Sequence, residues 1–248
     1  MVAQRNAGKH SGPAGLARHV FPMKYDGYHK YDRAVAESYD QTRQVEAHWW
    51  HEDRFVEEFF SKNQFGRLLD LPVGTGRFFQ HYKAIRSLTG VDVSENMLEQ
   101  ARKNLTTLAP AVHAELEKGD VFNLRFDDAA FDAAIVWRLI HLLPPDLLPK
   151  AVKELCRVTS QKILVQTYAA IPRNPWRARL GWIRSLIQGS NRQDARPWSH
   201  IKSFDHTQDF VDGLFAANGF VSSESLVLDK YEGKDVRATV YMRKQCRV

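Results

Sequence analysis

Apolar residues recur along this chain at two spacings, and the two alternate through its central part. Five short apolar runs are typical of buried β-strands: RLLDL at 67–71, SLTGVDV at 87–93, AVHAELEKGD at 111–120, FDAAIVW at 131–137 and KILVQTY at 162–168. Helix-like segments separate them: GRFFQHYKAI, SENMLEQARKNLTTL with Ser94 as its N-cap, and PPDLLPKAVKELCRVT. This alternation predicts a doubly wound α/β fold with a mostly parallel sheet and helices on both faces.

The two ends of the chain extend this prediction. Residues 207–220 have a helical pattern that stops at Asn218-Gly219, and two alternating strands, VSSESLVLD and VRATVYMRK, follow as a hairpin. They complete a seven-stranded sheet with an antiparallel C-terminal edge. Before the first strand, QVEAHWWHEDRFVEEFFSK predicts a helix on one face of the core. We expect a flexible tail at 1–22 and one domain at 23–248, with a helical cap over about 25–62.

The net charge of +6 is concentrated in three places. Residues 171–203 carry +6, residues 1–24 carry +4 and residues 242–248 carry +3, which leaves −7 on the rest of the chain. The segment 171–203 also interrupts the alternation after the fifth strand, so we interpret it as an insertion. Charge confined to the ends and one insertion argues against a uniformly basic body that binds nucleic acid.

The composition of the chain bears on its location in the cell. No apolar run approaches the roughly 20 residues that a membrane span needs. The first residues lack the apolar centre of a secretory signal, and the chain has two cysteines, so we expect a cytoplasmic protein. His48 and His51 lie three residues apart in one predicted helix, but no third ligand at a recognisable spacing accompanies them. We therefore expect no metal.

A glycine turn follows the first predicted strand, in Asp70-Leu71-Pro72-Val73-Gly74-Thr75-Gly76. In open parallel sheets, ligands bind beyond the carboxyl ends of the strands, nearest to this turn. Side chains at Gly74 and Gly76 would keep the backbone away from such a ligand. A dinucleotide fingerprint would need glycine where Phe79 stands, and the Lys-Ser/Thr pair of a P-loop is absent. The spacing thus disfavours a pyrophosphate ligand.

The same stretch resembles the first motif of the class I S-adenosylmethionine-dependent methyltransferases, of the small-molecule and quinone-biosynthesis type. That motif is an acidic residue followed by G-x-G-x-G, and Pro72 replaces its first glycine here. TGVDVSENMLEQAR resembles the second motif and EKGDVFNLRF the third, so the resemblance covers roughly residues 39–241. It implies a Rossmann-like fold, S-adenosylmethionine as the cofactor and S-adenosylhomocysteine as the product.

The resemblance also implies roles for individual residues around the cofactor. Asp92, beside Val93, would accept hydrogen bonds from both ribose hydroxyls, since a carboxylate has the acceptors for it. Asp120 would face the adenine amino group and Val121 the ring, with Met97 packed on it, while Asp70 would lie near the ammonium group and Trp137 near the methionine part. Leu71, Pro72, Gly74 and Gly76 would form the wall of this site. The alternatives are a solvated or capping role for Asp92 at a strand end, a turn role for Asp120 and a buried helix methionine without a ligand.

Three further residues are candidates for the acceptor side. His141 stands where related enzymes often place a histidine before Leu-Pro, and would act as a base or orient the acceptor; a structural histidine is the alternative. Arg138 would clamp an anionic acceptor or lie on the surface. Tyr39 would close over the cofactor, or simply pack against the fold. The segment 171–203 would be the acceptor lid, or a solvated helix face.

These features predict methyl transfer to a small-molecule acceptor, at oxygen or nitrogen rather than carbon. Anionic, aromatic and lipid-linked acceptors all fit the Arg- and Trp-rich insertion, the last with peripheral membrane contact. Two alternatives stay open: an RNA methyltransferase or nucleic-acid binder that uses the same arginines, and a protein that binds the cofactor without transferring methyl. Against the first, VWRL lacks the Asn/Asp-Pro-Pro-aromatic signature of amine methylation in nucleic acids. The sequence leaves the oligomeric state undetermined.

Overall fold

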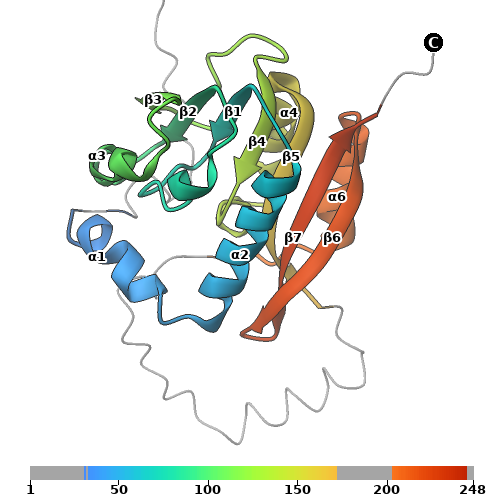
Figure 1. The fold of residues 1–248 in the computed structure, drawn as a ribbon. Helices are drawn as coiled ribbons and strands as arrows, with labels where there is room; N and C mark the ends of the chain where they lie inside the picture. The colour runs from blue at the N-terminus through green and yellow to red at the C-terminus, as the bar shows by residue number, and fades with distance from the viewer. Residues whose placement is uncertain (1–30, 32, 172–202, 245–248) are drawn as a thin grey trace, which may run out of the picture.

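The computed structural model describes residue 31, residues 33–171 and residues 203–244 (Figure 1). The predicted tail at 1–22 lies outside the described residues, and so does the predicted insertion apart from its first and last residues. None of the helices in the described part of the chain combines the length and the apolar character needed to cross a bilayer.

The sheet has the seven strands that the sequence predicts. They are β1 (Arg67–Asp70), β2 (Ser87–Asp92), β3 (His113–Lys118), β4 (Phe131–Val136), β5 (Thr159–Ala170), β6 (Phe220–Tyr231) and β7 (Lys234–Arg243), in the order β3-β2-β1-β4-β5-β7-β6. The first five are parallel, and β7 lies antiparallel between β5 and β6. The predicted mostly parallel sheet with an antiparallel C-terminal part is confirmed.

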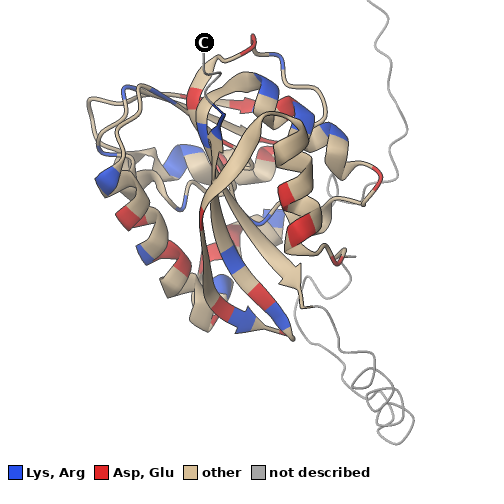
Figure 2. Ribbon diagram, turned by 90° about the vertical axis from the view of Figure 1, so that its right-hand side faces the viewer, with Lys and Arg blue, Asp and Glu red and all other residues tan. Residues whose placement is uncertain are grey.

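Helices cover both faces of this sheet (Figures 1 and 2). On one face, α2 (Ala47–Lys62) and α3 (Glu95–Asn104) share a core with side chains of β1, β2 and β4; on the other, α4 (Leu148–Val158) and α6 (Gln208–Ala217) pack on β4 and β5. The helix α1 (Arg33–Arg43) lies against α3. Ser94 caps α3 as predicted, because its Oγ accepts a hydrogen bond from the Met97 N–H.

One predicted helix does not form. After the glycine turn, residues 77–86 contain only a short 3-10 turn, Phe79–His81, where the pattern predicted an α-helix. The segment instead forms a series of turns, and from these it buries Phe78, Phe79 and Tyr82 in the core. Tertiary packing thus overrides the helical spacing of this segment.

Candidate functional site

The glycine turn lies at the carboxyl end of β1, between the ends of β2 and β4, where strand order reverses. Gly74 and Gly76 both have positive φ, 56° and 78°. A Cβ at Gly76 would come within 2.3 Å of the Phe79 ring, whereas a Cβ at Gly74 would meet nothing within 4 Å. The Phe79 ring therefore gives Gly76 a packing reason to be glycine, and contact of Gly76 with a ligand stays a prediction. Gly74 faces open space that a ligand can fill.

Pro72 fits the turn despite replacing the first glycine of the motif. The N–H groups on either side of it anchor the loop: Leu71 donates to the Ile135 carbonyl at 3.0 Å and Val73 to the Val91 carbonyl at 2.9 Å. Position 72 thus needs no donor of its own, which is the condition under which a proline is tolerated.

Asp92 joins the turn to the end of β2. Its Oδ2 accepts a hydrogen bond from the Gly74 N–H at 3.0 Å, and its Oδ1 accepts one from the Ser94 N–H at 2.9 Å. The side chain is 4% exposed, so it is not a solvated residue at a strand end, and the cap of α3 is Ser94 instead. The two N–H groups therefore fix the orientation of the carboxylate at the edge of the turn.

Asp70 ends β1 and is buried, with 2% of its surface exposed. The Tyr82 hydroxyl donates to its Oδ2 at 2.7 Å. Burial raises the pKa of Asp70 to about 7, with a further increase from the nearby Asp92 and a partial offset from the Tyr82 hydrogen bond. Sequence reasoning missed Tyr82. The available signal was a tyrosine at helical spacing from Phe78 and Phe79, because a buried phenol needs a polar partner.

The adenine side of the predicted site is built from the ends of β2 and β3. Met97 is buried in the first turn of α3, and Val93 is half-buried next to Asp92. Asp120 accepts a hydrogen bond from the Phe122 N–H at 3.0 Å and thereby shapes the turn after β3, in which Val121 is buried. The turn role proposed as the alternative for Asp120 is therefore present, and a contact with adenine stays a prediction.

The helix α1 closes one side of this region. Thr75 in the glycine turn donates to Asp40 of α1 at 2.9 Å, and the carbonyl of Tyr31, before α1, accepts hydrogen bonds from the side chains of Ser94 and Asn96. Tyr39, half-buried on α1, contacts the Tyr31 ring edge to face at 5.8 Å. Asp40 and Tyr31 thus contact the glycine turn and the start of α3.

Arg138 follows β4 with a φ of 56° and is 8% exposed, so the surface alternative for it is wrong. Its guanidinium donates to Glu46 and to Glu52, both at 3.1 Å. Burial alone would raise the pKa of Glu52, but Arg138 and Arg77 hold it below its ordinary value. A buried charge network thus ties α2 to the exit of β4. Glu52 lies four residues before Val56 on the apolar stripe of its helix, which was a visible signal for a buried charge.

Aromatic and imidazole rings gather at the carboxyl end of β5. The His141 ring meets the Tyr168 ring edge to face at 4.7 Å, and the Tyr168 hydroxyl lies 3.2 Å from Nε2 of His48. The same Nε2 lies 3.2 Å from Glu46, while Tyr231 contacts both His48 and Tyr168. His48 and Tyr168 were missed as site residues. His51, which lies three residues after His48, is near Asp229 instead. The described residues contain no group of three or more His, Cys, Asp or Glu suited to a metal ion.

Buried polar atoms without partners mark the same region. Among the described residues, Trp137 Nε1 and Gln166 Nε2 are buried donors with no hydrogen-bond acceptor, and Glu52 Oε1 is a buried acceptor with no donor. Gln166 is held by its other atom, Oε1, which accepts the Arg138 N–H at 3.1 Å. Such atoms are costly unless something binds them. With the open space at Gly74, they fit a site that takes a polar ligand.

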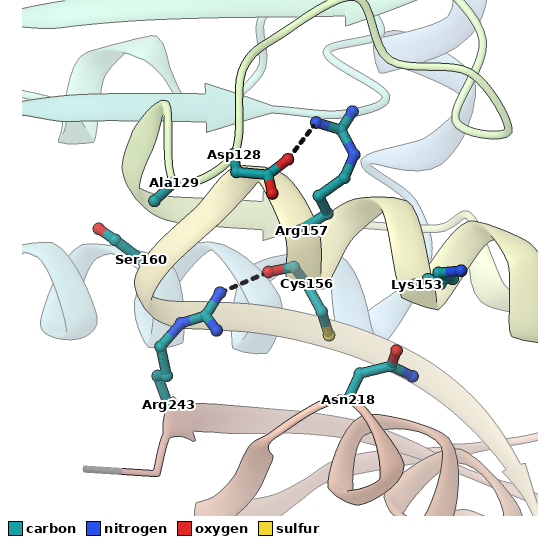
Figure 3. Close-up of a pocket in the computed structure, with 8 residues that line it drawn as sticks. All are labelled: Asp128, Ala129, Lys153, Cys156, Arg157, Ser160, Asn218 and Arg243. Atoms are coloured by element: carbon teal, nitrogen blue, oxygen red, sulfur yellow. Dashed lines mark hydrogen bonds and ion pairs between the residues drawn. The ribbon is translucent and has the colours of Figure 1, made fainter. Parts of the chain in front are cut away.

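A separate cavity of about 570 Å³ opens near the amino ends of the parallel strands, at the opposite end from the candidate site. It is lined by residues at the amino ends of β4 and β5, on α4, and at the ends of α6 and β7: Asp128, Ala129, Lys153, Cys156, Arg157, Ser160, Asn218 and Arg243 (Figure 3). Its arginines are engaged, because Arg157 pairs with Asp128 at 2.9 Å and Arg243 donates to the Cys156 carbonyl at 2.6 Å. This cavity is not part of the candidate site.

The strand order, the glycine turn after β1 and the carboxylate after β2 together define the class I methyltransferase architecture. Residues 68–162 also match the family described as "Methyltransferase domain". This part of the chain is therefore a class I methyltransferase domain, as the resemblance implied.

Two curated relatives match parts of the chain. It is 30% identical over 105 residues to the phosphatidylethanolamine N-methyltransferase of Cereibacter sphaeroides, covering 42% of this chain and 52% of that protein. It is 47% identical over 72 residues to the demethylmenaquinone methyltransferase of Desulfitobacterium hafniense strain Y51, covering 29% of this chain and 27% of that protein. The matched stretches thus span about half of the first relative and about a quarter of the second.

The fold also resembles solved structures. Magnesium protoporphyrin IX methyltransferase from Synechocystis PCC 6803, with bound SAH, superposes with a TM-score of 0.58 at 14% identity. The superposition covers 78% of this chain and 84% of that chain. It supports the fold.

Proposed function

We propose that this protein transfers a methyl group from S-adenosylmethionine to oxygen or nitrogen of a small-molecule acceptor. The observation that carries the proposal is the arrangement of Asp92. Its buried carboxylate is held by the N–H groups of Gly74 and Ser94 at the edge of a turn whose Gly74 faces open space. An acidic group fixed beside open backbone, at the switch point of a parallel sheet, suits an adenosyl ligand.

The proposed binding mode uses residues of the turn and of the next two strand ends. Asp92 accepts the ribose hydroxyls, and Val93 and Met97 line the adenine side with Asp120 and Val121. Asp70 is the acceptor for the ammonium group, and Trp137 borders the methionine part. Leu71, Pro72, Gly74 and Gly76 form the wall between them. In this mode Tyr39 and α1 cover the cofactor from the N-terminal side.

Bound S-adenosylmethionine supplies an electrophilic methyl group on sulfur, so the main task of the protein is alignment. Holding two reactants in line at about 3 Å contributes roughly 7–11 kcal/mol to a reaction of this kind. A general base adds about 10²–10⁴-fold and matters only for an acceptor that must lose a proton. We assign that role to His141, which the Tyr168 ring holds at the end of β5.

The acceptor would lie between α2 and the ends of β4 and β5. Tyr168 and His141 offer ring surfaces there, and the unpartnered donors of Trp137 and Gln166 offer hydrogen bonds. Arg138 is already paired with two carboxylates, so it positions α2 rather than clamping an anionic acceptor. A flat acceptor with a hydroxyl or amino group suits these surfaces, whether free or lipid-linked.

The nucleic-acid alternative rested on the segment 171–203, nearly all of which lies outside the described residues. In the part of the chain that the structure describes, Lys and Arg are interspersed with Asp and Glu (Figure 2). That mixture does not supply the one-signed surface that phosphate backbones require. We therefore retain the small-molecule proposal.

Calorimetry with S-adenosylhomocysteine, S-adenosylmethionine and NAD tests the cofactor. We expect micromolar binding of the first two, and Asp92→Ala should weaken it by about 1–3 kcal/mol through lost charged hydrogen bonds. Asp132→Ala is the matched control: Asp132 also accepts two backbone N–H groups, from Gly66 and Arg67 at 2.9 Å, but at the opposite edge of the sheet. Equal losses in both variants, or tighter binding of NAD, would refute the proposed site.

Turnover separates an enzyme from a protein that only binds the cofactor. The wild type would be incubated with S-adenosylmethionine and a panel of phenols, amines and carboxylic acids, and formation of S-adenosylhomocysteine measured. His141→Gln should slow the reaction of phenols, which must lose a proton, more than that of free amines. Cofactor binding without product from any panel member would favour the non-catalytic alternative.

A further inference from the structure

Asp70 and Tyr82 form a polar pair inside an apolar surrounding. Tyr82 is fully buried, its ring meets Phe60 of α2 at 4.8 Å, and its hydroxyl donates to Asp70 Oδ2 at 2.7 Å. Tyr82 reaches Asp70 from the segment 77–86, which forms turns and one short 3-10 turn. The hydrogen bond fixes which way the carboxyl of Asp70 points at the carboxyl end of β1.

The second oxygen of Asp70 is available to a ligand. Among the described residues, no group donates a hydrogen bond to Asp70 Oδ1, and no cation pairs with the carboxyl. The titratable groups that act on it are Tyr82, from the segment after the turn, and Asp92, at the end of β2. Asp92 adds a second negative charge near Asp70. From α2, the Phe60 ring packs against the Tyr82 ring and adds no charge. The surroundings thus hold a carboxyl that lacks a positive partner.

We propose that Tyr82 is a positioning residue for cofactor binding, and that the Asp70–Tyr82 pair couples this binding to the release of one proton. The inference rests on the proposed function, because it takes the ammonium group of the cofactor as the missing cation. Without ligand, near pH 7, Asp70 is partly protonated. When the ammonium group binds at Oδ1, the carboxyl O–H bond breaks, the proton leaves to solvent and a carboxylate–ammonium pair forms. The Tyr82 hydroxyl keeps its proton throughout and donates to the carboxylate.

The coupling predicts a defined pH dependence. Burial raises the pKa of the free carboxyl to about 7, while the Tyr82 hydrogen bond works in the opposite direction. The affinity of the wild type should therefore rise about tenfold from pH 6 to pH 8, the ratio of ionised carboxyl at the two values. Tyr82→Phe removes the hydrogen bond, so the midpoint of this rise should move to higher pH.

The experiment is titration calorimetry with S-adenosylhomocysteine between pH 5.5 and 8.5. Repeating it at pH 6.5 in two buffers of different ionisation enthalpy counts the protons released. Tyr241→Phe is the matched control, because Tyr241 is also fully buried and donates to an aspartate, Asp212 at 2.5 Å, on the other face of the sheet. The proton count uses the wild type alone, so it decides the coupling even if Tyr82→Phe does not fold.

Each outcome has a distinct meaning. Proton release by the wild type, together with a higher midpoint in Tyr82→Phe but not in Tyr241→Phe, supports the inference. Binding without proton release overturns the coupling, and an unchanged midpoint in Tyr82→Phe overturns the role of Tyr82; both leave the proposed function standing. Failure of the wild type to bind S-adenosylhomocysteine at any pH overturns the proposed function itself.

Discussion

Replacing Asp70 by asparagine should make the ligand-free protein more stable, and the gain should grow with pH. Asparagine has the shape of the carboxyl, keeps an oxygen for the Tyr82 hydroxyl and does not titrate. In the wild type, burial raises the pKa of Asp70 from 3.8 to about 7. Between these values the folded state holds a proton that the unfolded chain releases, so the free energy of unfolding falls as pH rises and levels off above about 7.

The magnitude follows from this difference. A change of about three pKa units at about 1.4 kcal/mol each corresponds to about 4 kcal/mol. No discount for solvent screening applies, since Asp70 is 2% exposed. Native domains have unfolding free energies of about 5–15 kcal/mol, so the effect is a large fraction of the total. The variant should match the wild type near pH 4 and exceed it by about 4 kcal/mol at pH 8.

Urea unfolding at pH 4.5, 6 and 8 without cofactor, followed by tryptophan fluorescence, measures this difference. Asp132→Asn is a control of opposite sign: hydrogen bonds from Arg67 and Gly66, against a burial effect, lower the pKa of Asp132. That variant should lose stability relative to the wild type as pH rises through the acidic range. If the free energies of unfolding of Asp70→Asn and the wild type differ by the same amount at pH 4.5, 6 and 8, burial does not raise the pKa of Asp70 and the prediction is refuted.

Two further predictions concern the turn and the charge network. Gly76→Ala should destabilise the fold by about 1–3 kcal/mol, because position 76 combines a positive φ with a 2.3 Å approach of the new Cβ to the Phe79 ring. Gly74→Ala should mainly weaken cofactor binding. Thermal unfolding and calorimetry on both variants separate these two effects, and equal behaviour of the two variants would contradict the prediction. Glu52→Gln should cost about 3–5 kcal/mol in urea unfolding, because it leaves the buried Arg77 and Arg138 undercompensated, while Glu58→Gln, on the exposed side of the same helix, should change stability by less than about 0.5 kcal/mol.

The strands of the sheet could be predicted from the sequence because the residue pattern that marks each strand is local. The strands β1, β2, β4 and β5 contain short apolar runs bounded by turn residues, and the parallel arrangement follows from the segments between them. The hairpin β6–β7 was likewise marked by alternation, with Gly219 at a φ of 82° ending the preceding helix. The prediction for the segment after the glycine turn was wrong because its apolar spacing fits a helix, whereas in the fold Phe78, Phe79 and Tyr82 are buried from a series of turns. Packing against the rest of the core decides this path, and spacing alone does not show it.

Part of the candidate site could be predicted from the sequence for the same reason. The turn and the acid after β2 lie in contiguous motifs, so their positions followed from the resemblance. Tyr82, His48 and Tyr168 reach the site from separate elements, and only the packed fold brings them together. Arg138 illustrates the limit: its position after β4 was correct, but its partners are about ninety residues earlier in the chain, on and beside α2.

The buried charges at the carboxyl edge of the sheet fall into two kinds, and the difference separates structure from binding. Arg138 and Glu52 neutralise each other at 3.1 Å, so their network holds α2 in place without a charged ligand. Asp70 has a phenol on one side and another carboxylate nearby, and no described cation pairs with it. A group kept in that state lowers stability unless a positive ligand arrives. In the proposed binding mode, the stability that the ligand-free protein loses at Asp70 would be recovered when the ammonium group of the cofactor binds. We therefore expect this carboxyl to determine cofactor affinity rather than the fold.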